Sequence, residues 1–369
     1  MNNESARRDL LSTSRTRLHV THDLDTTGRL AAENACVGIG KIVYALRHLG
    51  MRGDVRFVAS LDFTITRHAE RWGSGFSYGG ALEIMIEGDA IAIPEVRPNT
   101  CGTIVGVPRD EISASELMRR VCDARHTRKG TFDYSRKNHF VNVYRSSATG
   151  KPVFIIHGCP ARVKFDGHEG PGLYLETSSY WDARAMLIMT PLGPLRPLVG
   201  DNAVAYWENY RRCEERSKAD RLAVAKTIFD RYDLIADHTH EGMLAQHIYL
   251  HGCHAARTPE AVFPVMSSMG EPAFLVSRNA RSPTVGDNNA VLPHGTGYSI
   301  QVPARDFEMR YISDHDRVFF GHGAEHDEAY SSFEDVPFTY RPNDIVSEWE
   351  SQELLTIRDV LRPDLFMKL

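Results

Sequence analysis

Several features that would assign this sequence to a specialised class are missing from it. Its six cysteines include no Cys-x-x-Cys pair, and the N-terminus, rich in Arg, Ser and Asn, has no apolar signal-peptide core. We therefore expect a reducing cytoplasm as its compartment. No apolar run approaches the ~20 residues of a membrane helix. Because 43 Lys and Arg oppose 48 Asp and Glu, the net charge of -5 gives no global basic field, and any RNA or DNA contact must use a local patch.

The chain is long and apolar enough to bury a large core, with 369 residues of which 42% are hydrophobic. Length alone allows about two domains at the usual ~150 residues each. The sequence shows no internal repeat, low-complexity tract or clear linker, which favours one domain. We expect an α+β fold over residues 23–369, with mixed sheets of short strands packed against flanking helices. Residues 1–22 form a polar, Arg/Ser-rich lead whose composition is compatible with disorder.

Hydrophobic spacing predicts helices over residues 26–49, 113–124 and 206–231. Thr26 and Thr27 are expected to cap the first helix, in which Gly38 and Gly40 each cost about 1 kcal/mol. The third helix interleaves cations with anions, which favours a solvated face over a nucleic-acid patch. Residues 73–80 form a glycine-dense turn, either a ligand-binding loop or an ordinary tight connection. Short strands are predicted at residues 55–60, 81–87, 90–93, 103–107, 141–144, 153–156, 234–236, 248–250, 272–276, 298–302 and 311–312.

Five separated side chains stand at the edges of β-like runs, in or beside turns. They are Cys101, His139, His157, His240 and His294. Thiolate and imidazole are ligands of manganese, zinc and iron in proteins. Taken singly, the cysteine and each of the first three histidines are more readily explained as buried core residues. Their recurrence at strand ends is what favours a metal site formed by Cys101, His139, His157 and His240.

His294 has different surroundings from the other four. Pro293 precedes it, and Gly295, Thr296 and Gly297 follow it. Such a loop permits close approach of a phosphate, and an imidazole there could attack phosphorus to form a phosphoramidate. The alternative is a turn histidine with no chemical role, and the motif alone does not separate the two.

The remaining cysteines and histidines carry weaker signals. Cys159 and Cys253 each lie two residues after a histidine and could extend the metal set. Burial as a small hydrophobic residue is the commoner fate of a cysteine, and we favour it for both. His168, His322 and His326 lie in glycine-containing loops and are interpreted as surface residues.

The order and spacing of these segments resemble the RtcB family of RNA ligases from about residue 54 to the C-terminus. Each matching segment is short, but the segments follow one another in the family's order. They are residues 73–80 (Gly-x-Gly-Phe-x-x-Gly-Gly), Cys101-Gly102, Gly130-Thr131, Asn138-His139-Phe140, Ile156-His157, Asp237-His238-Thr239-His240, Ser268-Met269-Gly270, His294-Gly295-Thr296-Gly297, and Leu361-Arg362-Pro363 with Lys368.

RtcB ligases join RNA ends bearing a 3′-phosphate or 2′,3′-cyclic phosphate to 5′-hydroxyl ends, using GTP and manganese. The resemblance thus implies a single domain around a central metal cleft, one or two Mn²⁺ ions, GTP, and RNA as the partner, such as tRNA halves or broken ends in tRNA processing or RNA repair. It implies that His294 becomes guanylylated and that Cys101, His139, His157 and His240 hold the metal. The nucleotide-binding residues it implies are Asn138, Ser268, Gly295, Thr296, Gly297, Phe333 and Lys368.

The sequence departs from the family pattern at several of these places. Pro98 stands where the family has an aspartate near the metal cysteine, which removes one ligand of a second metal. Asn142 replaces a glutamate that reads the guanine edge, and this affects the expected preference for GTP. Phe333 replaces a tyrosine and keeps only the stacking ring. The family's basic element loses its arginine and lysine at residues 251–255. The metal set and the nucleophile therefore match the family better than the nucleotide and RNA contacts do.

Two other functions use the same residues. A metal-dependent phosphoesterase or cyclic-phosphate hydrolase would have the metal site without the nucleotide step, and it would work without His294. A catalytically silent RNA-binding relative would bind metal or RNA without turnover. The sequence predicts no oligomeric state.

Overall fold

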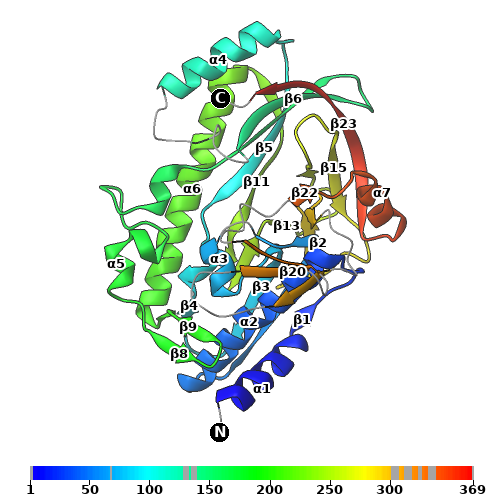
Figure 1. Cartoon of the computed structure of the whole chain (residues 1–369). Coiled ribbons are helices and arrows are strands. Elements are labelled where there is room, and N and C mark those ends of the chain that lie inside the picture. The colour runs from blue at the N-terminus through cyan, green and yellow to red at the C-terminus, as the bar shows by residue number, and fades with distance from the viewer. Residues whose placement is uncertain are drawn as a thin grey trace.

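One large sheet organises the structure, which is a computed structural model (Figure 1). It describes residues 3–66, 69–127, 133, 139–300 and 338–367, together with the backbone of residues 307–310, 318–322 and 326–330. The sheet has eleven strands, antiparallel at every pair except β1–β2. In spatial order these are β1 (Leu18–His19), β2 (Gly53–Thr64), β3 (Tyr78–Ile86), β12 (Ile248–His251), β11 (Tyr232–Ala245), β5 (Cys101–Pro108), β7 (Pro152–Gly158), β6 (Phe140–Ser146), β23 (Leu355–Met367), β15 (Ala273–Arg278) and β14 (Phe263–Val265).

Helices and small sheets surround this main sheet. The helices are α1 (Asn3–Arg15), α2 (Thr26–His48), α3 (Ala69–Ser74), α4 (Ala114–Thr127), α5 (Ser179–Asp182), α6 (Asp201–Phe229) and α7 (Asp344–Ser351). The small sheets pair β4 (Ile91–Ala92) with β10 (Leu198–Val199), β8 (Ile188–Thr190) with β9 (Gly193–Leu195), β18 (Tyr298–Ile300) with β22 (Phe338–Tyr340), β17 (Asn289–Pro293) with both β13 (Cys253–Ala256) and β16 (Thr284–Val285), and β20 (Val318–His322) with both β19 (Phe307–Arg310) and β21 (His326–Tyr330). The fold mixes α and β elements, as predicted.

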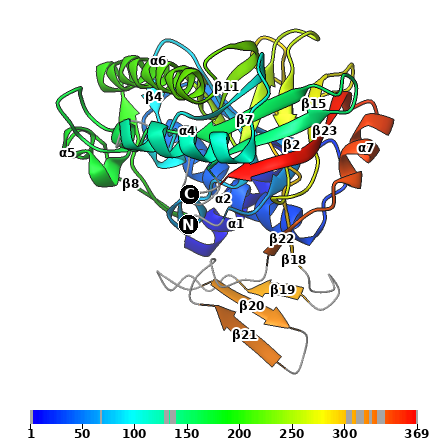
Figure 2. The same cartoon turned by 90° about the horizontal axis from the view of Figure 1, so that it is seen from above.

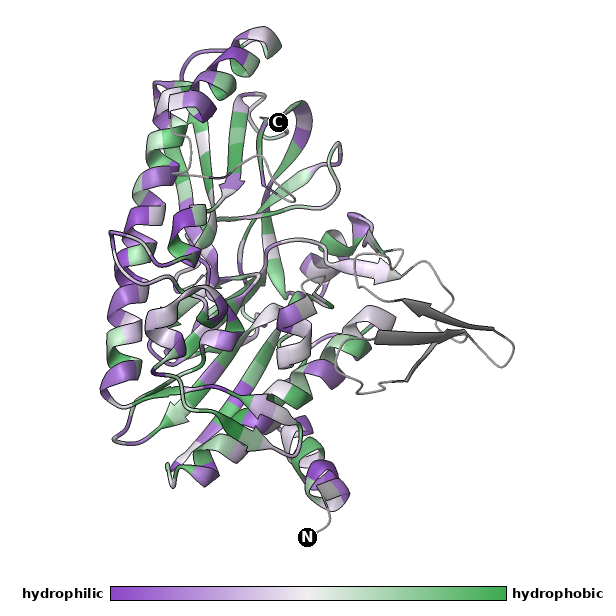
Figure 3. Ribbon diagram, turned by 60° about the vertical axis from the view of Figure 1, so that its left-hand side comes forward, coloured by the Kyte–Doolittle hydropathy of each residue, from purple (hydrophilic) through white to green (hydrophobic). Residues whose placement is uncertain are grey.

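Separate helices cover separate parts of the sheet. α2 packs on β2, whereas α6 packs on β5, β7 and β11, and α4 packs on α6 (Figure 2). The strands of the main sheet are rich in hydrophobic residues, and the helices alternate between hydrophobic and hydrophilic ones (Figure 3). One core cluster fills the space between α4, α6 and the sheet, with Leu117, Val121, Phe154, Val224 and Ile228 buried in it. No helix in the described part of the chain is long and apolar enough to cross a membrane.

The prediction of short strands is wrong for the centre of the sheet. β11 was expected only at residues 234–236 but extends from Tyr232 to Ala245. Two register shifts, between Leu234 and Ala236 and between Thr239 and Glu241, break the period-two alternation that the prediction required. The polar second half of β11 is held by pairing with β5 and β12 on its two sides. Tertiary pairing therefore extends a strand that the sequence pattern does not show.

The two N-terminal helices also differ from the sequence prediction. The polar lead is helical over α1, because Leu10 is buried in the core and the buried Ser14 hydroxyl donates to its carbonyl. Asp25, not Thr26 or Thr27, is the N-cap of α2 and accepts from the backbone of Gly28. Gly38 is required in α2, since a Cβ there would collide with the carbonyl of Gly75.

The charged helix α6 has the solvated, ion-paired face favoured by the sequence. Several of its cations pair with nearby acids, for example the exposed Lys226 with Asp230 at 3.1 Å. Arg221 is the exception, because it is fully buried and its Nε lies 2.8 Å from Asp237 of β11. It also donates to the carbonyl of Thr100 at 3.2 Å. This buried pair fixes α6 against the turn that precedes Cys101.

Candidate metal and nucleophile site

The five side chains singled out in the sequence come together at one end of four neighbouring strands. β11, β5, β7 and β6 are consecutive in the sheet. The register places Glu241 opposite Cys101, Thr103 opposite His157, and Phe140 opposite His157. Four places in these strands therefore meet: the first residue of β5, the end of β7, the start of β6 and the middle of β11. Strand pairing thus converts wide sequence separations into contact.

A first group of possible metal ligands consists of Cys101, His157 and His240. Their donor atoms lie within 4.8 Å of one another, and all three residues are buried. The Cys101 Sγ is 3.3 Å from His157 Nε2. Neither ring nitrogen of the fully buried His240 has a hydrogen-bond partner among the described residues. Leaving such a nitrogen unpaired costs about 1–3 kcal/mol, which a metal bond would offset.

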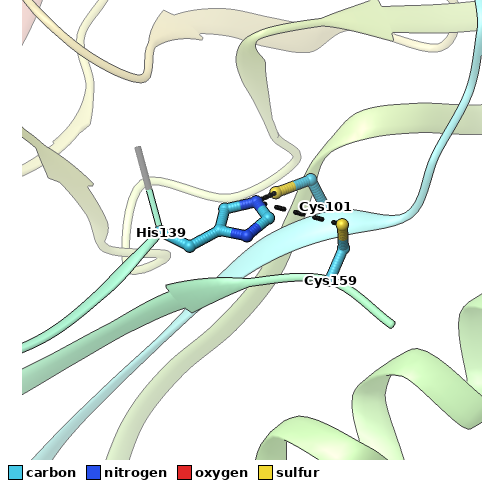
Figure 4. A group of neighbouring side chains, drawn as sticks. All are labelled: Cys101, His139 and Cys159. Carbon is cyan, nitrogen blue, oxygen red and sulfur yellow. Dashed lines mark hydrogen bonds between the residues drawn. The ribbon is translucent and has the colours of Figure 1, made fainter. Parts of the chain in front are cut away.

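A second group shares the same cysteine and adds His139 and Cys159 (Figure 4). The His139 Nε2 lies 3.5 Å from the Cys101 Sγ and 3.9 Å from the Cys159 Sγ. Burial alone would lower the pKa of His139, but Asp133 and the Cys159 thiolate outweigh it and raise the pKa to about 9. A hydrogen bond from Cys101, together with His139, lowers the pKa of Cys159 well below that of an ordinary thiol. This side of the site therefore favours a thiolate beside an imidazolium.

His294 lies directly against the first group. Its ring stacks on His240 at a centroid distance of 3.6 Å and stands edge-on to His157 at 5.0 Å. Burial, with the neighbouring rings of His157 and His254, lowers the pKa of His294 well below its usual value. The ring is therefore neutral at pH 7, as a nucleophilic imidazole must be.

Two further residues hold the His294 loop in place. Asp62 of β2 accepts hydrogen bonds from the backbone of His294 at 3.1 Å and of Gly295 at 3.0 Å. Burial raises the pKa of Asp62 to about 6, although these hydrogen bonds and that from Ser60 oppose the shift. His254 places its Nε2 3.3 Å from the Nδ1 of His294. Neither residue was predicted, because Asp62 is remote in sequence and His254 stands in a segment that departs from the family pattern.

The predicted nucleotide-binding residues have mixed positions. Ser268 is exposed, in the turn after Met266, whose backbone pairs with the His294 loop. Gly295 follows the nucleophile directly, but the Thr296 hydroxyl is buried and donates to the carbonyl of Arg341 at 2.9 Å. Gly297 has φ +78°, and a Cβ there would meet the Arg341 guanidinium. Thr296 and Gly297 thus shape the loop. Asn138, Phe333 and Lys368 lie outside the described residues.

Asn142, which replaces the family's guanine-reading glutamate, makes structural hydrogen bonds. It is buried in β6, and its amide donates to the Tyr144 hydroxyl at 3.2 Å. Its carbonyl oxygen accepts from the backbone of Met367 at 3.4 Å, which ties β6 to β23. One N–H and the carbonyl oxygen of this amide are therefore used in the packing of β6 and β23. A cavity of about 240 Å³ lies beside β11, lined in part by Lys218, His238 and Phe263.

The two additional cysteines have different fates. Cys159 belongs to the second ligand group, although burial alone was favoured for it. Its position two residues after His157, in extended chain, is the signal that could have identified it, since alternate residues of a strand point to the same side. Cys253 is buried elsewhere and its thiol donates to the carbonyl of Gly80 at 3.0 Å. The glycine-dense segment at residues 73–80 forms the end of α3 and the start of β3.

Comparison with known proteins gives no independent assignment. Neither a protein-family model nor a curated protein matches this sequence. The buried Cys/His groups could hold a metal ion, and that much follows from their geometry alone.

Proposed function

We propose that this protein is a metal-dependent RNA ligase that joins 3′-phosphate or 2′,3′-cyclic phosphate ends to 5′-hydroxyl ends through a guanylylated His294. The observation that carries the proposal is the stacking of His294 on His240 at 3.6 Å, inside a buried Cys/His group. A structural histidine would not need a set of ligands at its face. The resemblance to RtcB ligases supports the same assignment, with RNA ends such as tRNA halves as substrates in the cytoplasm.

The chemistry required of His294 is nucleophilic attack at phosphorus. A neutral ring nitrogen attacks the α-phosphorus of GTP, so that an N–P bond forms while the bond to the bridging oxygen breaks and pyrophosphate leaves. An oxygen of the RNA 3′-phosphate then attacks the same phosphorus and returns the electron pair to the imidazole. Finally the 5′-hydroxyl attacks the RNA phosphorus and releases GMP, and its proton goes to solvent. Asp62 holds the backbone of the His294 loop through these steps, and His254 contacts the His294 ring.

The residues present suit a resident cation. The unpaired nitrogens of His240 and the thiol of Cys101 are donors of the kind that divalent ions take up, and His157 completes the set. A bound cation, which the resemblance gives as manganese, would neutralise phosphate charge beside the nucleophile.

The decisive test is covalent labelling of His294. Purified protein is incubated with manganese and each of the four α-³²P-labelled nucleoside triphosphates, and an acid-labile protein adduct is measured. We expect an adduct with GTP that is lost in His294→Ala and kept in His247→Ala, a control histidine bonded to the carbonyl of Ile91. Absence of an adduct with every nucleotide would exclude the ligase mechanism.

A cyclic-phosphate hydrolase is the second candidate, because one observation favours it. Asn142 and Thr296 are both engaged in structural hydrogen bonds, so the ligand groups are better preserved than the nucleotide contacts. This alternative predicts opening of a 2′,3′-cyclic phosphate without any nucleotide, at a rate that His294→Ala leaves largely unchanged. The ligase proposal predicts that strand joining requires both GTP and His294.

A further inference from the structure

The second ligand group adds Cys159, which the ligase mechanism above does not use, to Cys101 and His139. Cys159 directly follows β7, and His139 directly precedes β6. Figure 4 shows the His139 ring directed between the two sulfur atoms. Cys101 and Cys159 are 3% and 1% exposed, so both thiols are withdrawn from solvent.

We propose that Cys101, His139 and Cys159 form a second cation site, selective for a thiophilic divalent ion of the zinc class, in which Cys101 bridges to the first site. The three donor atoms lie within 4.8 Å of one another, close enough to share one ion. Pro98 removes the carboxylate that the family resemblance placed here, and Cys159 supplies a ligand from another strand. The proposal shares Cys101 with the proposed function, but its test measures metal binding and does not depend on ligation.

A supporting shell holds this group in place. The Nδ1 of His139, on the other side of its ring, lies 3.6 Å from the Asp133 carboxylate. A carboxylate behind a ligating histidine orients the ring and strengthens its basicity. Asp133 is itself fixed to the site, because its backbone exchanges hydrogen bonds with that of Cys159 at 3.0 and 3.3 Å. The backbone of Asp133 is therefore held against the end of β7.

The donor atoms determine which cations are favoured. The two ligand groups, taken together, offer only sulfur and nitrogen among the described residues, with no carboxylate oxygen. Manganese prefers oxygen ligands, whereas zinc accepts thiolates and imidazoles at four-coordinate sites. The second group has two thiols, so we expect its preference for zinc over manganese to exceed that of the first group.

Cobalt provides the test, since Co²⁺ replaces zinc and gives a near-ultraviolet thiolate charge-transfer band. Metal-stripped full-length protein is titrated anaerobically with Co²⁺, and stoichiometry and band intensity are recorded. We expect two ions per wild-type chain, both displaced by Zn²⁺. Cys159→Ser should bind one ion with a weaker band. The control is Cys213→Ser, which should match wild type, because Cys213 is a cysteine of α6 that is buried in a different core cluster.

A second variant keeps the experiment decisive if Cys159→Ser folds poorly. Cys159→Asp keeps a ligand of different chemistry, so two ions should still bind, with the second site moved toward Mn²⁺ in competition with Zn²⁺. Two results would overturn the proposal: one ion per wild-type chain, or a Cys159→Ser titration identical to wild type. Failure of GTP labelling with two cobalt ions bound would remove the ligase and leave this site standing.

Discussion

The two ligand groups share one sulfur atom but have opposite surroundings. On one side of Cys101, His157 and His240 face the ring of His294. On the other side, His139 contacts Cys159 and lies near the carboxylate of Asp133. The first side therefore carries the proposed nucleophile, and the second group consists of candidate ligands alone. We infer from this comparison that the first group would be the reactive one and the second a structural or tuning site.

Electrostatics separates the two sides in the same way. Burial lowers the pKa of His240 and His294 well below the usual value, helped by the neighbouring imidazoles, so these rings are neutral. On the other side the pKa of His139 is raised to about 9 and that of Cys159 is lowered. Lys164 adds to this, since burial opposes its charge but Cys159 and its other neighbours raise its pKa. Neutral bases thus stand beside the nucleophile, and charged groups stand away from it.

Replacing Cys101, the ligand that the two groups share, should abolish metal binding on both sides. Cys101→Ser removes a donor from both groups, so we expect both cobalt ions to be lost and GTP labelling to fall to the level of His294→Ala. The loss in affinity should exceed the ~10–100-fold that removal of an outer-sphere partner costs. Cobalt titration and adduct formation measure it, with far-ultraviolet circular dichroism to show that the fold is kept. One ion still bound at wild-type affinity would show that Cys101 does not bridge the sites.

The sequence predicted this cluster through the recurrence of histidines at strand ends, which is a local pattern. It could not predict which strands are neighbours, and β11-β5-β7-β6 is an order in which chain neighbours β5 and β6 are separated by β7. Cys159 was under-weighted because a single cysteine is usually buried, and only the register against Asp133 shows its partner. Asp62 reaches His294 across 232 positions, and no local signal marks such a contact.

The long strands and the N-terminal helix were missed for a related reason. The period-two pattern detects a strand only where one face is apolar, and β11 carries the buried His240 and the half-buried Glu241 instead. Glu241 is kept by an ion pair with Arg71 at 3.1 Å, which the sequence does not indicate. In the same way, α1 is stabilised by packing on α2 and not by its own composition. Local propensity gave the type of β11 but not its length, and it missed α1, because tertiary contacts decide both.

Acid should distinguish the imidazole-rich side from the thiol side. His251 of β12 lies next to the imidazole-rich side. It is fully buried between Phe57 and Phe76, and both of its ring nitrogens are unpaired among the described residues. Burial, with Arg71, lowers its pKa to about 3. The folded state disfavours the charged ring. The contribution of the neutral His251 ring to stability is therefore complete above pH 6.5, and it is lost as the pH falls toward 3.

The expected size follows from that shift. When the pH is lowered from 7 to 4, only the unfolded state protonates His251, so the unfolding free energy of the metal-stripped protein should fall by about 3 kcal/mol. His251→Leu removes the titrating ring and should lose about 3 kcal/mol less over this interval, measured by urea denaturation at both pH values. The exposed His126→Leu is the control. Equal pH dependence in His251→Leu and wild type would show that the ring takes up its proton without penalty.

The smallest predicted effect concerns the orientation of the nucleophile within the first side. The Nε2 of His254 lies 3.3 Å from both the His294 Nδ1 and the carbonyl oxygen of Pro264. The carbonyl only accepts, so His254 can donate to it in one tautomer and accept from His294 in the other. In the second arrangement the His294 Nε2 keeps a lone pair for attack on phosphorus. His254 is therefore a positioning residue that selects the reactive tautomer.

Removing this contact should slow the reaction without emptying the metal sites. In His254→Leu we expect the rate of adduct formation to fall about tenfold, equivalent to ~1.4 kcal/mol, with two cobalt ions still bound. The matched control is His238→Leu, whose ring packs on the same Phe263 but whose Nε2 faces the carbonyl of Val262. His254→Gln, which can still accept from Nδ1, should recover part of the rate. A His254→Leu rate equal to that of His238→Leu would show that the cation alone, and not a neighbouring ring, orients His294.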